Sequence, residues 1–285
     1  MMLDIFRPLP PQARRETRAA YQEFLTARDG AMDIEKQQLV RREVGMLRYE
    51  KPLPRTREVD RDLFNAQYAS FDAKVTTPSE MLLLLALVKA NAAEAFGVTQ
   101  VFDAIHRRAV KNNDMCELTL MVEETYHTRI LLSTALSYGV EMRAPYKPPV
   151  ALRTLIAGVS VTPEAVSRPL TLAAEILGLC TFLNLLERSR EVLRHDPELR
   201  DGVEERLCEV ITDELGHMSF NRACLGPAGF AQVRLMLPIV ARGVAGVVPE
   251  IRALGAGTLA SESEIAGLAS GRRLPEHVVK SAFLS

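Results

Sequence analysis

The amino-acid sequence predicts an all-α fold, in which four long helices form a central bundle and further helices precede and follow it. Apolar residues recur at helical spacing along almost the whole chain, and we find no alternating strand segments joined by hairpin signals. Proline and glycine gather at a few points, which divide the chain into long helical runs. With 285 residues, a single domain spanning 1–285 can bury one large core.

The first part of the chain, residues 1–76, is expected to be an N-terminal helical extension. One or two polar amphipathic helices are predicted over residues 12–49, with a break near Asp29-Gly30. The prolines in the segment 51–54 then predict an extended connector, because proline cannot continue a helix.

Residues 77–225 are expected to form the four-helix core, and its first two helices are separated by a turn at 112–114. The segment Thr77-Pro78-Ser79-Glu80 is typical of a helix start. This helix should run to about Val110, with a kink or interruption at 97–99, where Gly97 weakens it. The second helix is predicted over 115–138 and ends at a glycine.

The other two core helices are predicted on either side of the turn His195-Asp196-Pro197. The third starts at Thr162-Pro163-Glu164 and continues to about 194, after a proline-rich loop. The fourth should be capped by Asp196, opened by Pro197 and ended near Leu225. Residues 226–285 are expected to add an apolar helix over about 228–254 and short C-terminal helices.

Composition argues against several classes of protein. The chain has 35 basic and 36 acidic residues, so no large single-sign field would attract nucleic acid or an anionic membrane. The four cysteines are widely spaced and predict reduced core residues. The start lacks a signal-peptide pattern, and the most apolar segment, 81–88, ends at Lys89, too soon to span a bilayer. We therefore expect a soluble, cytoplasmic protein without nucleic-acid or membrane partners.

Two of the five histidines stand in nearly identical surroundings. The segments Glu123-Glu124-Thr125-Tyr126-His127 and Asp213-Glu214-Leu215-Gly216-His217 each place a glutamate three residues before a histidine. Residues i and i+3 share one face of a helix, so each pair could chelate one metal ion. A single Glu-x-x-His is usually a surface pair. Two of them, each preceded by an acid and surrounded by apolar residues, favour a metal site.

A site for two metal ions needs one more carboxylate from each remaining core helix. Glu175 lies within an apolar run, where a carboxylate that is neither paired nor bound to a metal ion would cost several kcal/mol. Glu175 and Glu214 are also equally distant from the turn at 195–197. In an antiparallel hairpin they should therefore lie at the same height.

Two acids compete for the fourth position. Glu94 lies among alanines, which leave space for a metal ion, whereas Asp103 precedes a polar stretch. Asp103 lies as far from the predicted turn at 112–114 as Glu124 does, so spacing alone favours it. The apolar neighbourhood favours Glu94. An interruption at 97–99 would lengthen the path between the helices and so bring Glu94 level with Glu124.

The acids that precede the two glutamates are candidates for orienting the histidines. A histidine that binds a metal usually donates its other ring nitrogen to a carboxylate. Asp213 could orient His127 across the bundle, and Glu123 could do the same for His217. The alternative for Glu123 is a solvent-exposed ion pair with an arginine. The other histidines, His106, His195 and His277, lie in polar surroundings or near the C-terminus and are expected to be structural.

The order of these segments resembles that of the ferritin-like dinuclear-iron carboxylate proteins, such as ribonucleotide reductase small subunits, multicomponent monooxygenases and acyl desaturases. Residues 122–128 and 174–177 are most similar to the p-aminobenzoate N-oxygenase type, and the resemblance covers about 80–225. It implies a ferritin-like four-helix bundle in which six residues bind the metal ions: Glu94, Glu124, His127, Glu175, Glu214 and His217.

The chain departs from the family pattern at two positions. The additional histidine ligand of the arylamine oxygenases would fall at Val210, and the threonine of the multicomponent monooxygenases at Leu179. The resemblance therefore leaves N-oxygenation and hydroxylation both open.

Four carboxylates and two imidazoles suit iron or manganese better than copper or zinc. We expect two iron ions, with a manganese–iron pair as the variant, and O₂ as co-substrate, because two ferrous ions can together supply two electrons. Apolar residues near the motifs are expected to line a pocket for a small apolar or aromatic substrate: Leu87, Ala90, Leu179, Phe182 and Met218. An external electron donor, a ferredoxin or reductase, and a homodimer are the partners considered.

Two other functions compete with a diiron oxygenase or oxidase. One is a non-enzymatic ferritin-like protein that binds or stores iron. The other is a helical interaction module in which the motifs bind nothing. Storage proteins of this fold are usually shorter, and the long segments on either side of the core favour an enzyme.

Overall fold

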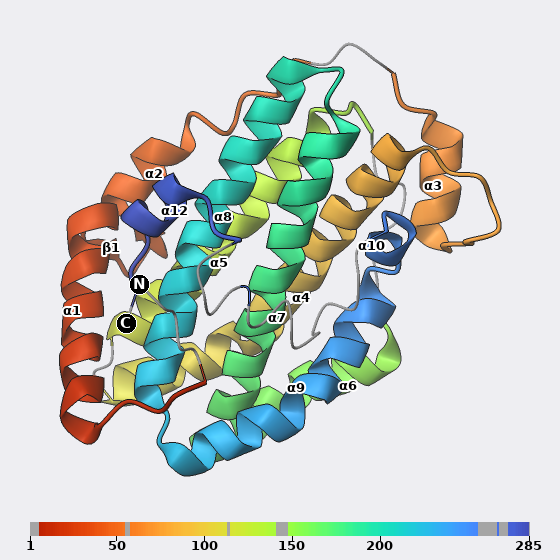
Figure 1. Ribbon diagram of the computed structural model, residues 1–285. Helices are drawn as coiled ribbons and strands as arrows, with labels where there is room; N and C mark the ends of the chain where they lie inside the picture. Colours follow the sequence, from red (N-terminus) through yellow and green to blue (C-terminus); the bar gives the residue numbers. More distant parts are fainter. Residues whose placement is uncertain are drawn as a thin grey trace.

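Four long helices form the centre of the computed structural model, which describes residues 6–54, 58–112, 115–140, 148–255, 267 and 273–284. They form two antiparallel hairpins (Figure 1). The helices are α4 (Ser79–Asn112), α5 (Met115–Leu136), α7 (Glu164–Val192) and α8 (Pro197–Cys224). α5 also packs on α8, and α4 packs on α7, so the four helices enclose one core. The all-α prediction is confirmed.

The segment before the bundle holds α1 (Pro11–Asp29), α2 (Val40–Met46) and α3 (Arg61–Ala69). Between α1 and α2 the chain reverses through Gly30, whose φ of 84° favours glycine. A Cβ at Gly30 would also lie 3.0 Å from the backbone nitrogen of Arg41. The reversal contains a two-residue antiparallel pair, β1 (Met32–Asp33) with β2 (Gln38–Leu39), and brings α2 back beside α1.

The predicted turn between the third and fourth core helices is present. Asp196 accepts a hydrogen bond from the backbone N–H of Leu199 at 3.3 Å, and Pro197 is the first residue of α8. Residues 113–114 of the predicted turn at 112–114, and residues 141–147, which include part of the predicted proline-rich loop, lie outside the described residues.

Several elements differ from the prediction, which did not include α3. The interruption at 97–99 is wrong, because α4 is helical throughout. Thr99 instead donates to the Ala95 carbonyl at 2.7 Å, a contact that often bends helices, and the helix changes direction between its orange and yellow parts (Figure 1). A further helix, α6 (Val150–Val161), precedes α7. The apolar C-terminal helix is divided at Pro249 into α9 (Pro227–Val247) and α10 (Glu250–Ala253), and α12 (Glu276–Ser281) follows.

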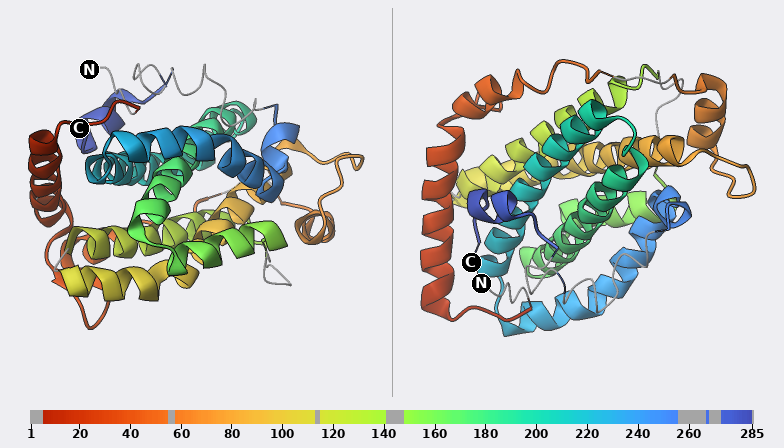
Figure 2. Two further views of the ribbon diagram at one scale, coloured as in Figure 1. Left: turned by 90° about the horizontal axis from the view of Figure 1, so that it is seen from below. Right: turned by 45° about the horizontal axis from the view of Figure 1, so that its top comes forward.

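The added helices cover different sides of the bundle. α1 packs on α5 and α8, whereas α9 packs on α7 and α4 and α6 packs mainly on α4. The right-hand view of Figure 2 shows α1 upright at one edge and α9 along another. The α5–α8 side is therefore covered by the N-terminal segment, and the α4–α7 side by α6 and α9.

Three helices are long and apolar enough to cross a membrane by length and composition: Ser79–Lys111, Glu164–Val192 and Pro227–Val247. The protein itself buries 56% of the apolar window in the first, 72% in the second and 28% in the third. The prediction that Lys89 ends the apolar segment is therefore wrong. Lys89 is buried and paired with Glu250, and the apolar helix continues past it. Solubility and a cytoplasmic location stay predictions.

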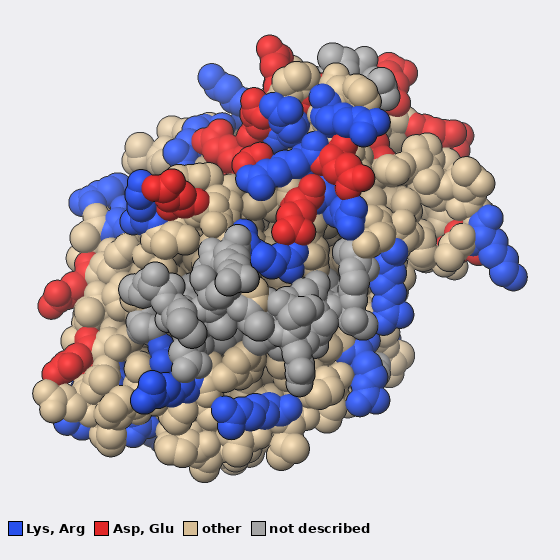
Figure 3. All heavy atoms as spheres, viewed as in Figure 1, with Lys and Arg blue, Asp and Glu red and all other residues tan. Residues whose placement is uncertain are grey.

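Charged side chains of both signs are interspersed on the face shown in Figure 3, where they gather over the α7–α8 turn at the top. Ion pairs there include Arg188 with Glu191 at 2.6 Å and Arg200 with Asp201 at 2.7 Å. This mixture agrees with the formal net charge of −1.

Candidate metal centre

The two Glu-x-x-His motifs lie on α5 and α8, in stretches where nearly every residue is buried. His127 and His217 are both 0% exposed, and their ring centroids lie 5.4 Å apart. The interpretation of these motifs as surface ion pairs is therefore excluded. Helical spacing aims each glutamate and its histidine at the same interior space.

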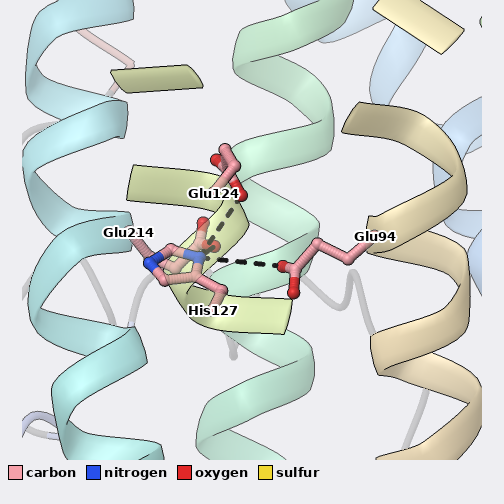
Figure 4. Close-up of side chains that lie close together, drawn as sticks. All are labelled: Glu94, Glu124, His127 and Glu214. Carbon is pink, nitrogen blue, oxygen red and sulfur yellow. Dashed lines mark ion pairs between the residues drawn. The ribbon is translucent and has the colours of Figure 1, made fainter. Parts of the chain in front are cut away.

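The Nδ1 atom of His127 faces carboxylates from three helices. It lies 3.3 Å from Glu124 Oε2 on α5, 3.4 Å from Glu214 Oε1 on α8 and 4.0 Å from Glu94 Oε1 on α4. Figure 4 shows the side chains of this group directed toward one another. The candidate ligand atoms of the four residues all lie within 4.8 Å of one another.

His217 belongs to a second group of the same kind. Its Nδ1 atom lies 2.9 Å from Glu124 Oε1 and 3.8 Å from Glu175 Oε2 on α7, and Glu214 completes the group within the same 4.8 Å limit. Glu124 and Glu214 belong to both groups. The two groups therefore adjoin, and each could hold a metal ion.

The structure brings together all six residues that the sequence analysis proposed as ligands. Glu175 and Glu214 lie in one group, in agreement with their equal distance from the α7–α8 turn. Asp103 is exposed and lies outside both groups, so the apolar neighbourhood was a better guide than spacing.

The other nitrogen of each histidine contacts an acid of the opposite motif. His127 Nε2 lies 3.1 Å from Asp213 Oδ2, and His217 Nε2 lies 3.3 Å from Glu123 Oε2. Both acids are buried, so a solvent-exposed Glu123 is excluded. These are the pairs that the sequence analysis named, and their orienting role stays a prediction.

Three residues of the N-terminal segment approach the same acids, and sequence reasoning did not identify them. Arg28, at the end of α1, is ion-paired with both Glu123 and Asp213. Arg42 of α2 donates to Asp213 at 2.6 Å, and the Tyr21 hydroxyl donates to Glu123 at 3.4 Å. The segment was predicted as polar helices, and its sequence alone does not show that these side chains are directed inward.

Burial and mutual repulsion raise the pKa of Glu94 and Glu175 well above the ordinary range of a glutamate. Burial also opposes ionisation of Glu124, but His217 and His127 outweigh it and lower the pKa of Glu124. Burial disfavours the charged imidazoles, but Glu124 and the other carboxylates raise the pKa of both histidines. Without metal ions, the cluster therefore retains protons, and these protons balance part of its negative charge. Bound cations would balance that charge instead.

The donor atoms fit a bound cation. The Nδ1 atoms of His127 and His217 and Oε2 of Glu94 are buried and form no hydrogen bond with the described residues, although carboxylates surround them. A cation between these atoms would satisfy them together. Four carboxylates and two imidazoles form an oxygen-rich set that suits iron or manganese.

A cavity of about 300 Å³ adjoins the cluster, and Glu94, Glu124, Glu175 and Glu214 are among the residues that line it. The rest of the lining is mostly apolar. Residues of α6 and α9 that the sequence analysis did not name contribute to it: Ile156, Val240, Val244 and Val247.

The predicted pocket lining is only partly correct. Ala90 and Phe182 line the cavity as expected. Leu87, Leu179 and Met218 belong to the main hydrophobic core but are not among the residues that line the cavity.

Comparison of the chain with protein-family models, curated proteins and solved structures finds no match. The function is therefore inferred from the residues of this site.

Proposed function

We propose that this chain is a ferritin-like, non-haem diiron oxygenase or oxidase that acts on a small apolar or aromatic substrate. N-oxygenation and hydroxylation are the reactions considered. One observation carries the proposal: six side chains from four helices converge beside an apolar cavity, with both histidine Nδ1 atoms directed at carboxylates.

Helix order supports the ferritin-like arrangement. Ferritin-like bundles have one long connection between two helical hairpins, and α5 and α7 are joined by the connection that contains α6. In proteins of this class two helices each provide a glutamate and the other two a Glu-x-x-His. Here Glu94 and Glu175 come from α4 and α7, and the motifs from α5 and α8.

Two ferrous ions held by these residues would supply two electrons for the activation of O₂, and a manganese–iron pair is the variant. The four carboxylates balance the charge of two divalent cations, which lets the site stay buried. Asp213 and Glu123 accept from Nε2 and so present the Nδ1 lone pairs to the cations. The apolar lining excludes water and holds the substrate.

The cavity favours a substrate without a negative charge. Among the described residues that line it, the charged groups are the four glutamates, and none is a lysine or arginine. An aromatic carboxylate such as p-aminobenzoate would have no arginine or lysine partner in this lining. We therefore favour neutral substrates, with a ferredoxin or reductase as electron donor and a cytoplasmic monomer or homodimer as the working form.

The test is O₂ consumption by the chain loaded with iron under anaerobic conditions and supplied with a chemical reductant. We expect consumption that increases with a neutral aromatic such as toluene or aniline more than with benzoate. Glu124→Ala and His217→Ala should abolish it, whereas His195→Ala, at an exposed position, should not. A cage-sized particle that accumulates iron, with no consumption coupled to substrate, would favour iron storage instead.

A further inference from the structure

The end of α1 carries a guanidinium group that contacts three buried acids. Arg28 donates to Asp29 from Nε at 3.0 Å and from Nη2 at 2.8 Å, which fixes the plane of the group. Nη1 lies 2.7 Å from Asp213 Oδ1, and Nη2 is paired with Glu123 Oε1. Its guanidinium group also lies over the ring of Phe24, with 5.1 Å from Cζ to the ring centroid.

These contacts connect the two histidines to one side chain. Glu123 holds Nε2 of His217, and Asp213 holds Nε2 of His127. Arg28 contacts the other oxygen of each acid. A shift of this one guanidinium would therefore displace both acids and, through them, both imidazoles.

The two buried acids, Glu123 and Asp213, also need a positively charged partner, which Arg28 provides. Glu123 and Asp213 are both 0% exposed at the side chain, and a buried carboxylate without a partner is strongly destabilising. Asp213 has a second arginine, Arg42. Among the described residues, the ion pairs of Glu123 are with Arg28 and His217.

A glycine in the second motif leaves space for another residue of α1 to reach Glu123. Gly216 lies inside the second motif, and a Cβ there would lie 3.1 Å from the Tyr21 hydroxyl. The absence of a side chain lets Tyr21 reach Glu123 from the same helix that carries Arg28. α1 thus contacts Glu123 at two points.

We propose that Arg28 is a positioning residue of the metal centre, which holds Glu123 and Asp213 together so that both histidines present Nδ1 to the cations at once. This inference rests on the proposed metal site. Arg28 provides several N–H donors in a rigid plane, which a lysine cannot reproduce. Arg28→Lys should therefore keep the positive charge but lose the geometry of the contacts with the two acids.

The experiment is a titration of the full-length chain with Co²⁺, whose visible absorption bands report the coordination geometry. Wild type is compared with Arg28→Gln, Arg28→Lys and the control Arg190→Gln, which removes an arginine paired with Glu204 near the α7–α8 turn. Arg28→Gln should weaken binding by about 10- to 100-fold and shift the bands, since loss of partners that orient ligands has effects of this size. Arg28→Lys should weaken binding less, and Arg190→Gln should match wild type.

A double variant separates positioning from a general loss of stability. If Arg28 acts through Glu123, then Arg28→Gln should cost less affinity in a Glu123→Gln background than in wild type. Urea unfolding in the presence of a chelator gives the stability of each variant. Arg28→Gln with wild-type affinity and bands would overturn the role of Arg28, as would equal losses in both backgrounds. A wild-type chain that binds no Co²⁺ would instead overturn the metal centre, and this role with it.

Discussion

His127 on α5 and Asp213 on α8 meet at 3.1 Å between Nε2 and Oδ2, while Nδ1 of the same ring faces Glu124 and Glu214. An imidazole that donates from Nε2 presents a lone pair at Nδ1, and the donated bond fixes both the tautomer and the plane of the ring. His217 and Glu123 repeat the relationship in the opposite direction. In the proposed metal site, the face of each histidine that would bind a cation is thus set by the other helix.

Asp213→Asn should weaken metal binding by about 10- to 100-fold, because the amide no longer offers His127 a charged acceptor. The measurement is calorimetric titration with Fe²⁺ under anaerobic conditions. Asp213 also pairs with Arg28 and Arg42, so the substitution changes the stability of the fold as well. Urea unfolding in the presence of a chelator measures that change separately. Equal affinities for variant and wild type would contradict an orienting role for Asp213.

Asp29 should make the stability of the metal-free chain fall as the pH rises, whereas Asp33 should not. Burial, followed by the charge of Glu123, raises the pKa of Asp29 to about 7. The folded chain then binds a proton that the unfolded chain has already released. The stabilisation is fully present below the ordinary pKa and is lost as pH rises through the folded value.

The metal-free chain and its Asp29→Asn variant can therefore be compared by urea unfolding between pH 4 and pH 7. The advantage of wild type should fall with rising pH, by up to roughly 1.4 kcal/mol per unit. Asp33→Asn is the control. Hydrogen bonds from Lys36 lower the pKa of Asp33, which is ionised in both states above about pH 5, so its difference should stay flat from there to pH 7. A flat difference for Asp29→Asn would show that its pKa is not raised.

Gly97→Leu should fill part of the cavity without harming the fold. Gly97 lines the cavity, and a Cβ there would meet no atom within 4 Å. Replacing a helical glycine should stabilise α4 by up to about 1 kcal/mol. Toluene binding, followed by NMR, should weaken at least about tenfold, since even small changes of volume matter in a packed interior.

Gly243→Leu is the matched control for this substitution. Gly243 also lies in a helix with no atom within 4 Å of a Cβ, but it does not line the cavity. It should gain similar stability and keep toluene binding. If both variants bind toluene as wild type does, the cavity is not the binding site.

Local spacing made the motif residues predictable. Glu124 with His127 and Glu214 with His217 follow from helical periodicity, and Glu175 follows from the symmetry of a hairpin. Glu94 required its apolar neighbourhood, because the bend of α4 changes heights that an ideal hairpin would predict. The apolar pattern of the four core helices was equally readable, since each spans more than twenty residues.

Contacts between distant segments could not be predicted in this way. Arg28 lies 95 residues before Glu123, and Arg42 lies 171 residues before Asp213, so only the packing of α1 and α2 brings them together. The same holds for Val240 and Val244 of the cavity wall. α6 was missed because two prolines precede it directly and β-branched residues and a glycine weaken its helical preference.

The metal content of the purified chain tests the central claim most directly. Protein from iron-supplemented cells should contain about two ions of iron, or of iron and manganese, per chain. The double variant His127→Ala with His217→Ala should lose most of them while remaining helical by circular dichroism. A wild-type content below about half an ion per chain, where this class of site holds two, would contradict the account.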